Sequence, residues 1–231
     1  MGTPMKRGEE LVGLLATPGL GRDEIGRAAN ELLSALFAGF PVTALVPLLR
    51  SENTEAVKAG AWLVSELGEG AAPVIGEIAA LLAHPQAYVR HFALDAVITA
   101  TTEADGELIA GGIRLVDDPN PGVREKVIRL LSVIPAARLA AALPHLIGDT
   151  GHELTTWLLR EAEHPEEAAG ATARLESADP AERRFAAALA LRIADHNDEP
   201  LARAAEASDP DIASLAAFVL RRRDRRRRRS R

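Results

Sequence analysis

The best candidates for metal chemistry lie between positions 145 and 164. Imidazole and carboxylate groups are common zinc ligands, but two ligands on one helix must stand three or four residues apart to reach the same ion. No pair of histidines here has that spacing, and the sequence lacks a His-Glu-x-x-His motif. We therefore interpret these residues as ordinary surface residues and expect no metal site. The group comprises His145, His152, His164, Glu153, Glu161 and Glu163.

Residue sets for nucleophilic or acid–base catalysis are also missing. The chain has no cysteine, which excludes a thiol nucleophile, thiolate metal sites and disulfides. It has neither a Gly-x-Ser-x-Gly elbow nor a Gly-rich phosphate loop. Asp117-Asp118 and Glu166-Glu167 are adjacent carboxylates, and adjacent residues on a helix do not face one another. We expect no catalytic residue and no cofactor.

Trp157 and Arg160 form one candidate for recognition. An exposed indole near a guanidinium can stack on a base or anchor a protein partner. The alternative is that Trp157 fills a gap inside an irregular part of the fold.

An arginine-rich tail is the second candidate. Residues 221–231 hold nine Arg and one Asp, which leaves 18 basic and 32 acidic residues in 1–220, a net charge of −14. We expect the first tail residues to extend the last helix and the rest to be disordered, because adjacent guanidiniums repel one another. The tail could bind nucleic acid, an anionic membrane surface or an acidic protein, fold back on the acidic body, or simply aid solubility. Its candidate electrostatic residues are Arg225, Arg226, Arg227, Arg228 and Arg229.

The composition of the 231 residues indicates a helical scaffold. Apolar residues make up 47% and aromatic residues only 3%, so the core must consist mostly of small aliphatic side chains that suit stacked helices. No apolar run is long enough to span a bilayer, and residues 1–10 lack the apolar core of a signal peptide. We expect a soluble, cytoplasmic protein.

A repeat of about 30 residues runs along the chain. Each copy places apolar or small residues at an anchor position and again four and seven or eight residues later, which lines one helical face. Successive anchors are 32, 32, 34, 31, 29 and 29 residues apart, if Arg183 is taken as the anchor of an Ala-rich sixth copy. The other six copies are Ile25/Ala29/Leu33, Val57/Ala61/Val64, Val89/Ala93/Val97, Val123/Val127/Leu131, Leu154/Leu158/Ala162 and Ile212/Ala216/Leu220.

Turn signals precede the copies. A polar residue before Pro suits a helix start in His84-Pro85, Asp118-Pro119, Asp179-Pro180 and Asp209-Pro210. A shorter apolar segment lies upstream of each turn. The sequence therefore predicts seven antiparallel helix pairs, about fourteen helices in total, and no strand.

The units resemble HEAT repeats of the short bacterial kind, which also occur in the phycobilisome-lyase-like HEAT family. Residues 45–49 and 142–146 match the Pro-containing first helix of that family, and Asp118 to Arg124 match its turn and second-helix start. Thr150 to Glu153 in the fifth unit depart from the pattern. The resemblance implies an all-α, right-handed α-solenoid of about seven HEAT-like helix pairs over residues 1–220, followed by the basic tail 221–231. It further suggests that Asp118 joins Arg90 or Arg124 in a polar ladder between turns.

The leading functional hypothesis is a non-catalytic, protein-binding scaffold, adaptor or inhibitor that uses the concave face of the solenoid. Its acidic body favours a partner with a basic surface. An immunity protein that neutralises a cationic toxin would fit this charge. Positions two, three and six after an anchor should lie off the core. The candidate binding residues are Trp157, Arg160, Asp95, Arg129 and His91.

Two alternatives belong to other classes. One is a HEAT-like enzyme, either a bilin-lyase-like protein or an alkylpurine DNA glycosylase. The scarcity of Tyr and Trp offers little to line a tetrapyrrole pocket, and the −14 body disfavours gripping phosphates. The other alternative is a nucleic-acid accessory factor that acts through the arginine tail.

Overall fold

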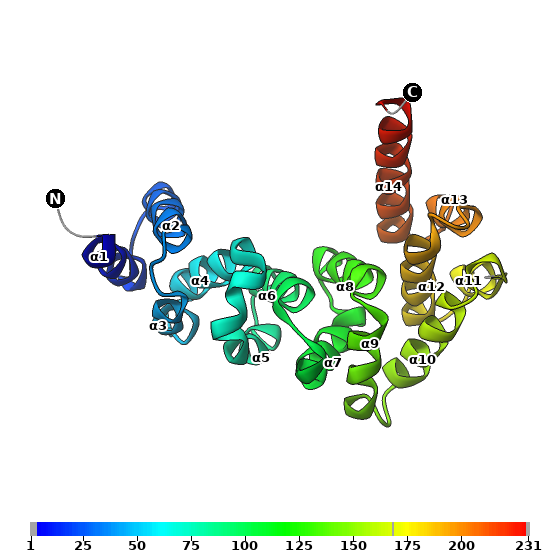
Figure 1. The fold of residues 1–231 in the computed structure, drawn as a ribbon, viewed down its shortest axis with the longest axis horizontal. Helices are drawn as coiled ribbons and strands as arrows, with labels where there is room; N and C mark the ends of the chain where they lie inside the picture. The colour runs from blue at the N-terminus through cyan, green and yellow to red at the C-terminus, as the bar shows by residue number, and fades with distance from the viewer. Residues whose placement is uncertain (1–3, 168, 230–231) are drawn as a thin grey trace. The chain divides into compact units, whose positions relative to one another are not determined.

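The computed structural model describes residues 4–167 and 169–229, and every regular element in that part of the chain is a helix (Figure 1). The prediction of an all-α chain of about fourteen helices without strands is confirmed for the described residues. By its internal contacts the chain divides into two compact units, residues 1–101 and residues 102–231.

The unit of residues 1–101 is a two-layer stack of helices. α2, α4 and α6 pack side by side, while α1, α3 and the η2 segment pack beneath them. Asn53 begins α4 by accepting a hydrogen bond from the backbone N–H of Glu55 at 3.1 Å, which satisfies one of the free donors of a helix start. The elements are α1 (Pro4–Ala16), α2 (Arg22–Phe37), η1 (Val42–Leu45), α3 (Val46–Leu49), α4 (Thr54–Leu67), η2 (Gly68–Glu77), α5 (Ile78–Leu82) and α6 (Ala87–Ala100).

The unit of residues 102–231 begins in the same way, with α7 packed on α9 and α7 also on α8. Its later helices depart from a regular stack. The elements are η3 (Glu103–Asp105), α7 (Gly106–Ile113), η4 (Arg114–Asp117), α8 (Pro121–Val133), α9 (Ala136–Ala142), η5 (Leu143–His145), α10 (Thr150–Ala162), η6 (Pro165–Glu167), α11 (Ala169–Leu175), α12 (Pro180–Ile193), α13 (Glu199–Ala205) and α14 (Pro210–Arg229).

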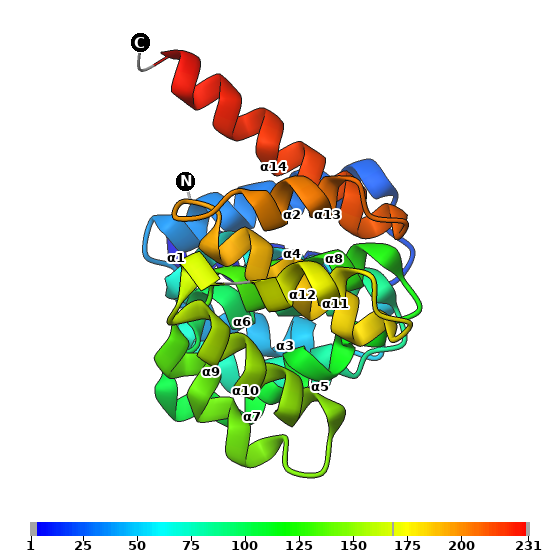
Figure 2. The ribbon, with the colours of Figure 1, turned by 90° about the vertical axis from the view of Figure 1, so that its right-hand side faces the viewer.

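The helix α12 is the centre of this second unit. It packs against α8, α10, α11 and α13, whereas α8 and α10 make little direct contact (Figure 2). The five consecutive residues 186–190 are all buried, and a helix that is apolar on every side belongs in a core. α12 therefore occupies the place beside α8 that a regular repeat array would give to the second helix of the fifth unit, α10.

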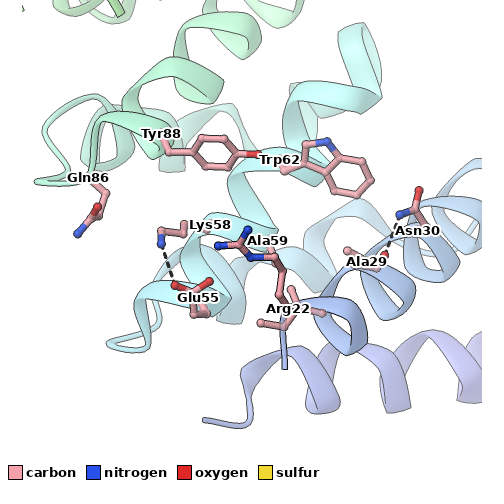
Figure 3. Close-up of a pocket in the computed structure, with 11 residues that line it drawn as sticks. Arg22, Ala29, Asn30, Glu55, Lys58, Ala59, Trp62, Gln86 and Tyr88 are labelled. Atoms are coloured by element: carbon pink, nitrogen blue, oxygen red, sulfur yellow. Dashed lines mark hydrogen bonds and ion pairs between the residues drawn. The ribbon is translucent and has the colours of Figure 1, made fainter. Parts of the chain in front are cut away.

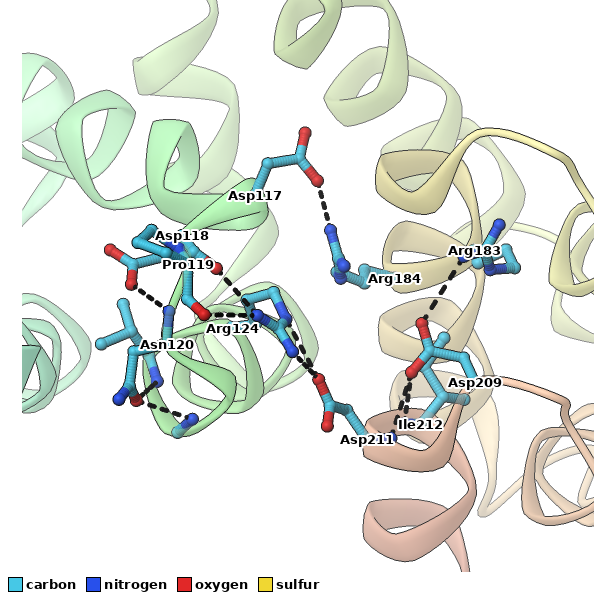
Figure 4. Close-up of polar contacts among 12 residues, drawn as sticks. Asp117, Asp118, Pro119, Asn120, Arg124, Arg183, Arg184, Asp209, Asp211 and Ile212 are labelled. Atoms are coloured by element: carbon cyan, nitrogen blue, oxygen red, sulfur yellow. Dashed lines mark hydrogen bonds and ion pairs between the residues drawn. The ribbon is translucent and has the colours of Figure 1, made fainter.

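Charged side chains of α12 and α14 hold this arrangement (Figure 4). Arg184 is only 8% exposed; it donates to the carbonyl of Val116 at 3.0 Å and pairs with the carboxylate of Asp117. Arg192 donates to the carbonyl of Leu131 at 2.9 Å, and burial lowers the pKa of its guanidinium. These contacts tie α12 to both ends of the α8 region.

A second arginine motif recurs at the helix starts. Arg90, Arg124 and Arg183 each donate from Nη1 to the backbone carbonyls six and five residues earlier, at 2.7 to 3.1 Å. These turn arginines donate hydrogen bonds to backbone carbonyls that accept none within a helix. Arg124 also pairs with Asp211 of α14, with Nε and Oδ2 3.0 Å apart. Arg124 thus contacts both the backbone carbonyl of Asp118 and the side chain of Asp211.

Two of the four predicted helix starts are displaced. Asp179 caps α12 and Asp209 accepts from the first turn of α14, as predicted. At His84 and Asp118 the helix begins later, because each of these side chains accepts from the N–H two residues on. The caps are consequently Gln86 and Asn120, and Pro121 rather than Pro119 is the first helical residue of α8.

The register also needs correction in the first and sixth copies. In α2 the buried position is Leu32, while Leu33 is half-buried. In α12 the turn-arginine contacts place Arg183 at the position of Arg90 and Arg124, one residue after the anchor and not at it. Because the middle of α12 is buried on every side, its apolar residues do not mark one helical face. The position of the repeat anchor therefore cannot be read from its sequence.

No single described helix has the length and apolar character to cross a membrane. A pair of segments bent by 118°, Pro121–Val133 with Ala136–His145, passes the same criteria only when both are taken together.

The turn at His84 predicts a pH dependence. Burial, and secondly the charge of Arg90, lower the pKa of His84, so the unfolded chain binds a proton more readily than the folded chain. Stability should therefore be complete above about pH 6.5 and decrease as the pH falls below it. Replacing His84 with Asn keeps an acceptor for Gln86 and should reduce the change in the urea midpoint between pH 7.5 and 5.0. Replacement of the exposed His164 should leave that change as in the wild type; an unchanged dependence in His84→Asn would contradict the assignment.

Candidate binding pocket

A pocket lies in the unit of residues 1–101 (Figure 3). It has a volume of about 590 Å³, within the range of sites that take small molecules. Residues of α2, α4 and the start of α6 line it: Arg22, Ile25, Gly26, Ala29, Asn30, Glu55, Lys58, Ala59, Trp62, Gln86 and Tyr88.

Two aromatic side chains line the pocket. Trp62 comes from α4 and is half-buried, while Tyr88 from the first turn of α6 is 54% exposed. Phe92 supports Tyr88 in an edge-on contact with ring centroids 4.4 Å apart. No described residue accepts a hydrogen bond from the indole N–H of Trp62. The pocket therefore offers apolar ring area together with a free donor, a combination enriched in binding sites.

Cations and amides surround these rings. Lys58 donates to Glu55 at 2.7 Å, so the single carboxylate of the lining is already paired. Arg22 has no ion-pair partner within the described part of the chain. Asn30 donates its amide to the carbonyl of Gly26 at 2.7 Å, which leaves its side-chain oxygen as an acceptor. The floor at Gly26 is open, since an added Cβ would meet nothing within 4 Å.

A simple count from the helix caps locates this surface. Gly26 and Asn30 stand five and nine residues after the cap Gly21 of α2, and Lys58 and Trp62 stand at the same positions after Asn53 of α4. Positions four residues apart share a helical face. Because α2, α4 and α6 pack side by side, these equivalent positions form one stripe across the unit. We call it the cap-plus-five/nine stripe.

Three of the predicted binding residues occupy equivalent positions. His91 and Asp95 stand five and nine residues after the cap Gln86 and continue the stripe on α6, although they do not line the pocket. Both are half-buried. Arg129 stands nine residues after Asn120 on α8 and is exposed. These predicted residues therefore stand at positions equivalent to those of the pocket, whereas the pocket itself is lined by the copies on α2 and α4 and by the start of α6.

The other two predicted residues do not form the expected pair. Trp157 is 7% exposed and therefore fills space inside the fold, as the alternative interpretation held. Its ring lies under the guanidinium of Arg174 of α11, 4.6 Å from the centroid, and not beside Arg160. The Arg160 side chain is 69% exposed and contacts Glu161 at 3.1 Å.

In the tail, α14 continues to Arg229. Arg223 pairs with Asp195 at 3.1 Å and Arg227 with Asp198 at 3.7 Å, and these pairs oppose the repulsion among guanidiniums. Arg is also a good helix former. The side chains of Arg226, Arg228 and Arg229, and all of residues 230 and 231, lie outside the described part.

The three histidines considered first are dispersed among structural roles. His152 contacts the carbonyl of Leu143 through Nδ1 at 3.1 Å, and the carbonyl of His145 accepts from Arg114. His164 is exposed. Within residues 4–167 and 169–229, no group of three or more His, Asp or Glu side chains is arranged to hold a metal ion.

Comparison with known proteins bears on the fold alone. No protein-family model matches this chain, and no curated protein matches it. Among solved structures, the crystal structure of an engineered protein from the Northeast Structural Genomics Consortium is similar over 93% of this chain and 67% of that one, with a TM-score of 0.50 and 18% sequence identity. At this identity the likeness supports an all-helical architecture and nothing about function.

The contrast between the two tryptophans is directly measurable. Trp157→Phe leaves Trp62 as the single tryptophan, and Trp62→Phe leaves Trp157; excitation at the red edge of the indole band avoids Tyr88. Acrylamide should quench the Trp62 protein several-fold more strongly, because this indole faces the open pocket whereas Trp157 is buried under Arg174. Equal quenching constants would show that the pocket is closed in solution.

Proposed function

We propose that this chain is a non-catalytic protein-binding module built on a HEAT-type, right-handed solenoid of about seven helix pairs. The pocket formed by α2, α4 and the start of α6 receives an anchoring side chain of the partner. One observation carries the proposal: the pocket combines Trp, Tyr and Arg, the residue types most enriched at energetic centres of protein interfaces.

The layered packing supports the solenoid part of the proposal. In residues 1–101 the second helices α2, α4 and α6 form one layer and the first helices another, as stacked helix pairs require. The cap-plus-five/nine stripe lies across the second-helix layer. In a solenoid such a stripe serves as the recognition surface.

Charge favours a partner with a basic surface. Residues 1–220 carry a net charge of −14, and an acidic field of this kind accelerates encounter with a cationic protein in a salt-dependent way. We therefore propose an adaptor or inhibitor in the cytoplasm, with an inhibitor of a cationic toxin as one form of this function. The long-range field brings the partner close, and the pocket fixes its orientation.

The second candidate is a HEAT-like enzyme, either a glycosylase or a bilin lyase, which one feature of the pocket favours. It holds aromatic rings, a carboxylate and cations within one cavity. Against it, Glu55 is engaged by Lys58 and residues 1–101 hold eleven acidic and seven basic residues, which opposes binding of phosphates. Release of alkylated bases from DNA, or a change in bilin absorbance, would establish this candidate instead.

The proposal can be tested by filling the pocket without harming the fold. Gly26→Leu extends into open space and replaces a helical Gly, so stability should rise by about 0.5–1 kcal/mol while partner capture is lost. Trp62→Ala should weaken capture by about 30-fold or more. The measurement is low-salt capture of proteins from the source cell, followed by titration of the captured protein.

Gly13→Leu in α1 is the matched control, since a Cβ at Gly13 also meets nothing within 4 Å and Gly13 lies outside the pocket. It should gain similar stability and retain the partner. Equal capture by the Gly26→Leu, Trp62→Ala and Gly13→Leu proteins, or no capture by the wild type, would refute the proposal.

A further inference from the structure

The C-terminal part of α14 is a second surface, unrelated to the pocket. Residues 221–229, here called the arginine arm, contain eight Arg and one Asp in a continuous helix. Figures 1 and 2 both show this end of α14 extending beyond α12 and α13. Arg221, Arg222 and Arg225 are exposed, and Arg222 lies 5.7 Å from the ring centroid of Phe218.

One face of the arm is held by its own unit. Arg223 and Arg227, one helical turn apart, pair with Asp195 and Asp198 in the connection between α12 and α13. The two carboxylate side chains are 90% and 58% exposed, so these pairs are well solvated and readily exchanged for other anions. The contacts orient the arm without neutralising it.

The charge density of the arm matches that of a nucleic-acid duplex. Nine helical residues extend over about 13.5 Å, and eight Arg with one Asp give a net of roughly one positive charge per 1.9 Å. Double-stranded DNA carries one phosphate charge per about 1.7 Å of its axis. Guanidinium groups also bind phosphate oxygens in pairs, with a geometry that ammonium groups do not offer.

The composition of the arm favours a nucleic-acid duplex over a protein or a membrane surface. Residues 221–229 include no apolar side chain. A protein interface needs an apolar centre, and a helix that lies on a membrane needs an apolar face. A phosphate backbone needs neither, because counterion release supplies the binding energy.

We infer that the arginine arm docks on the phosphate backbone of double-stranded nucleic acid, without sequence preference, in exchange for Asp195 and Asp198. Duplex phosphates replace the two carboxylates on one face of the arm and bind Arg221, Arg222 and Arg225 on the others. The acidic body limits the contact to the arm and gives it a strong dependence on salt.

The test is fluorescence anisotropy of labelled 20-base-pair DNA duplexes with the full chain between 50 and 200 mM KCl. The wild type should bind duplexes of unrelated sequence equally. The triple variant Arg221→Gln, Arg222→Gln, Arg225→Gln should lose at least about 10-fold in affinity at low salt, with the slope of log K against log salt smaller by about 2 to 3. The double variant Asp195→Asn, Asp198→Asn should bind more tightly, because the competing anions are removed.

A matched triple variant, Arg27→Gln, Arg129→Gln, Arg160→Gln, changes the net charge equally at exposed sites elsewhere and should bind like the wild type. Equal losses in both triple variants would reduce the effect to net charge and overturn the inference. Tighter binding to polyglutamate of equal charge would assign the arm to an acidic protein, and a strong preference between duplex sequences would contradict backbone docking.

Discussion

The direct packing of α12 on α8 is the constraint on which the unit of residues 102–231 depends. A buried guanidinium is costly unless it finds acceptors. The buried Arg184 donates to the carbonyl of Val116 and pairs with Asp117, and the half-buried Arg192 donates to the carbonyl of Leu131. Moving α12 away from these acceptors would leave the guanidinium of Arg184 buried without them, so the arginines favour this position of α12. This explains how a helix whose apolar surface is mostly alanine acquires a unique neighbour.

The same contacts decide where recognition can take place. The turn arginines Arg90, Arg124 and Arg183 are occupied by carbonyls of their own turns, and Arg124 also holds α14 through Asp211. Among the described residues, two other places offer chemistry to a partner. One is the aromatic pocket on α2, α4 and α6, and the other is the arginine arm. They differ in kind, since the pocket combines ring area with a few polar groups and the arm offers charge alone.

Local signals in the sequence were sufficient to predict the helices, because turn residues and apolar spacing act within a single repeat of about 30 residues. They failed where a tertiary contact decides the outcome. The departure at Thr150 to Glu153 pointed to the region where α10 is displaced, but the replacement of α10 by α12 depends on Arg184 and Arg192, more than 60 residues from their acceptors. Trp62 and Tyr88 were missed because the distance from helix cap to anchor differs by one residue between copies. Positions counted from the anchors therefore fall on different helical faces. Counting from the caps would have placed Trp62 beside Asn30 on one stripe.

A double-mutant cycle between Arg124 and Asp211 tests the packing of the second unit most directly, because these residues are 87 positions apart and meet only if α14 and α12 close on α8. Urea unfolding of Arg124→Gln, Asp211→Asn and the double variant would give the coupling free energy, with the exposed pair Arg203 and Glu176 as reference. The packing described above predicts a coupling of about 1 kcal/mol or more for Arg124 and Asp211 and close to zero for the reference. Additivity within about 0.3 kcal/mol for Arg124 and Asp211 would contradict it.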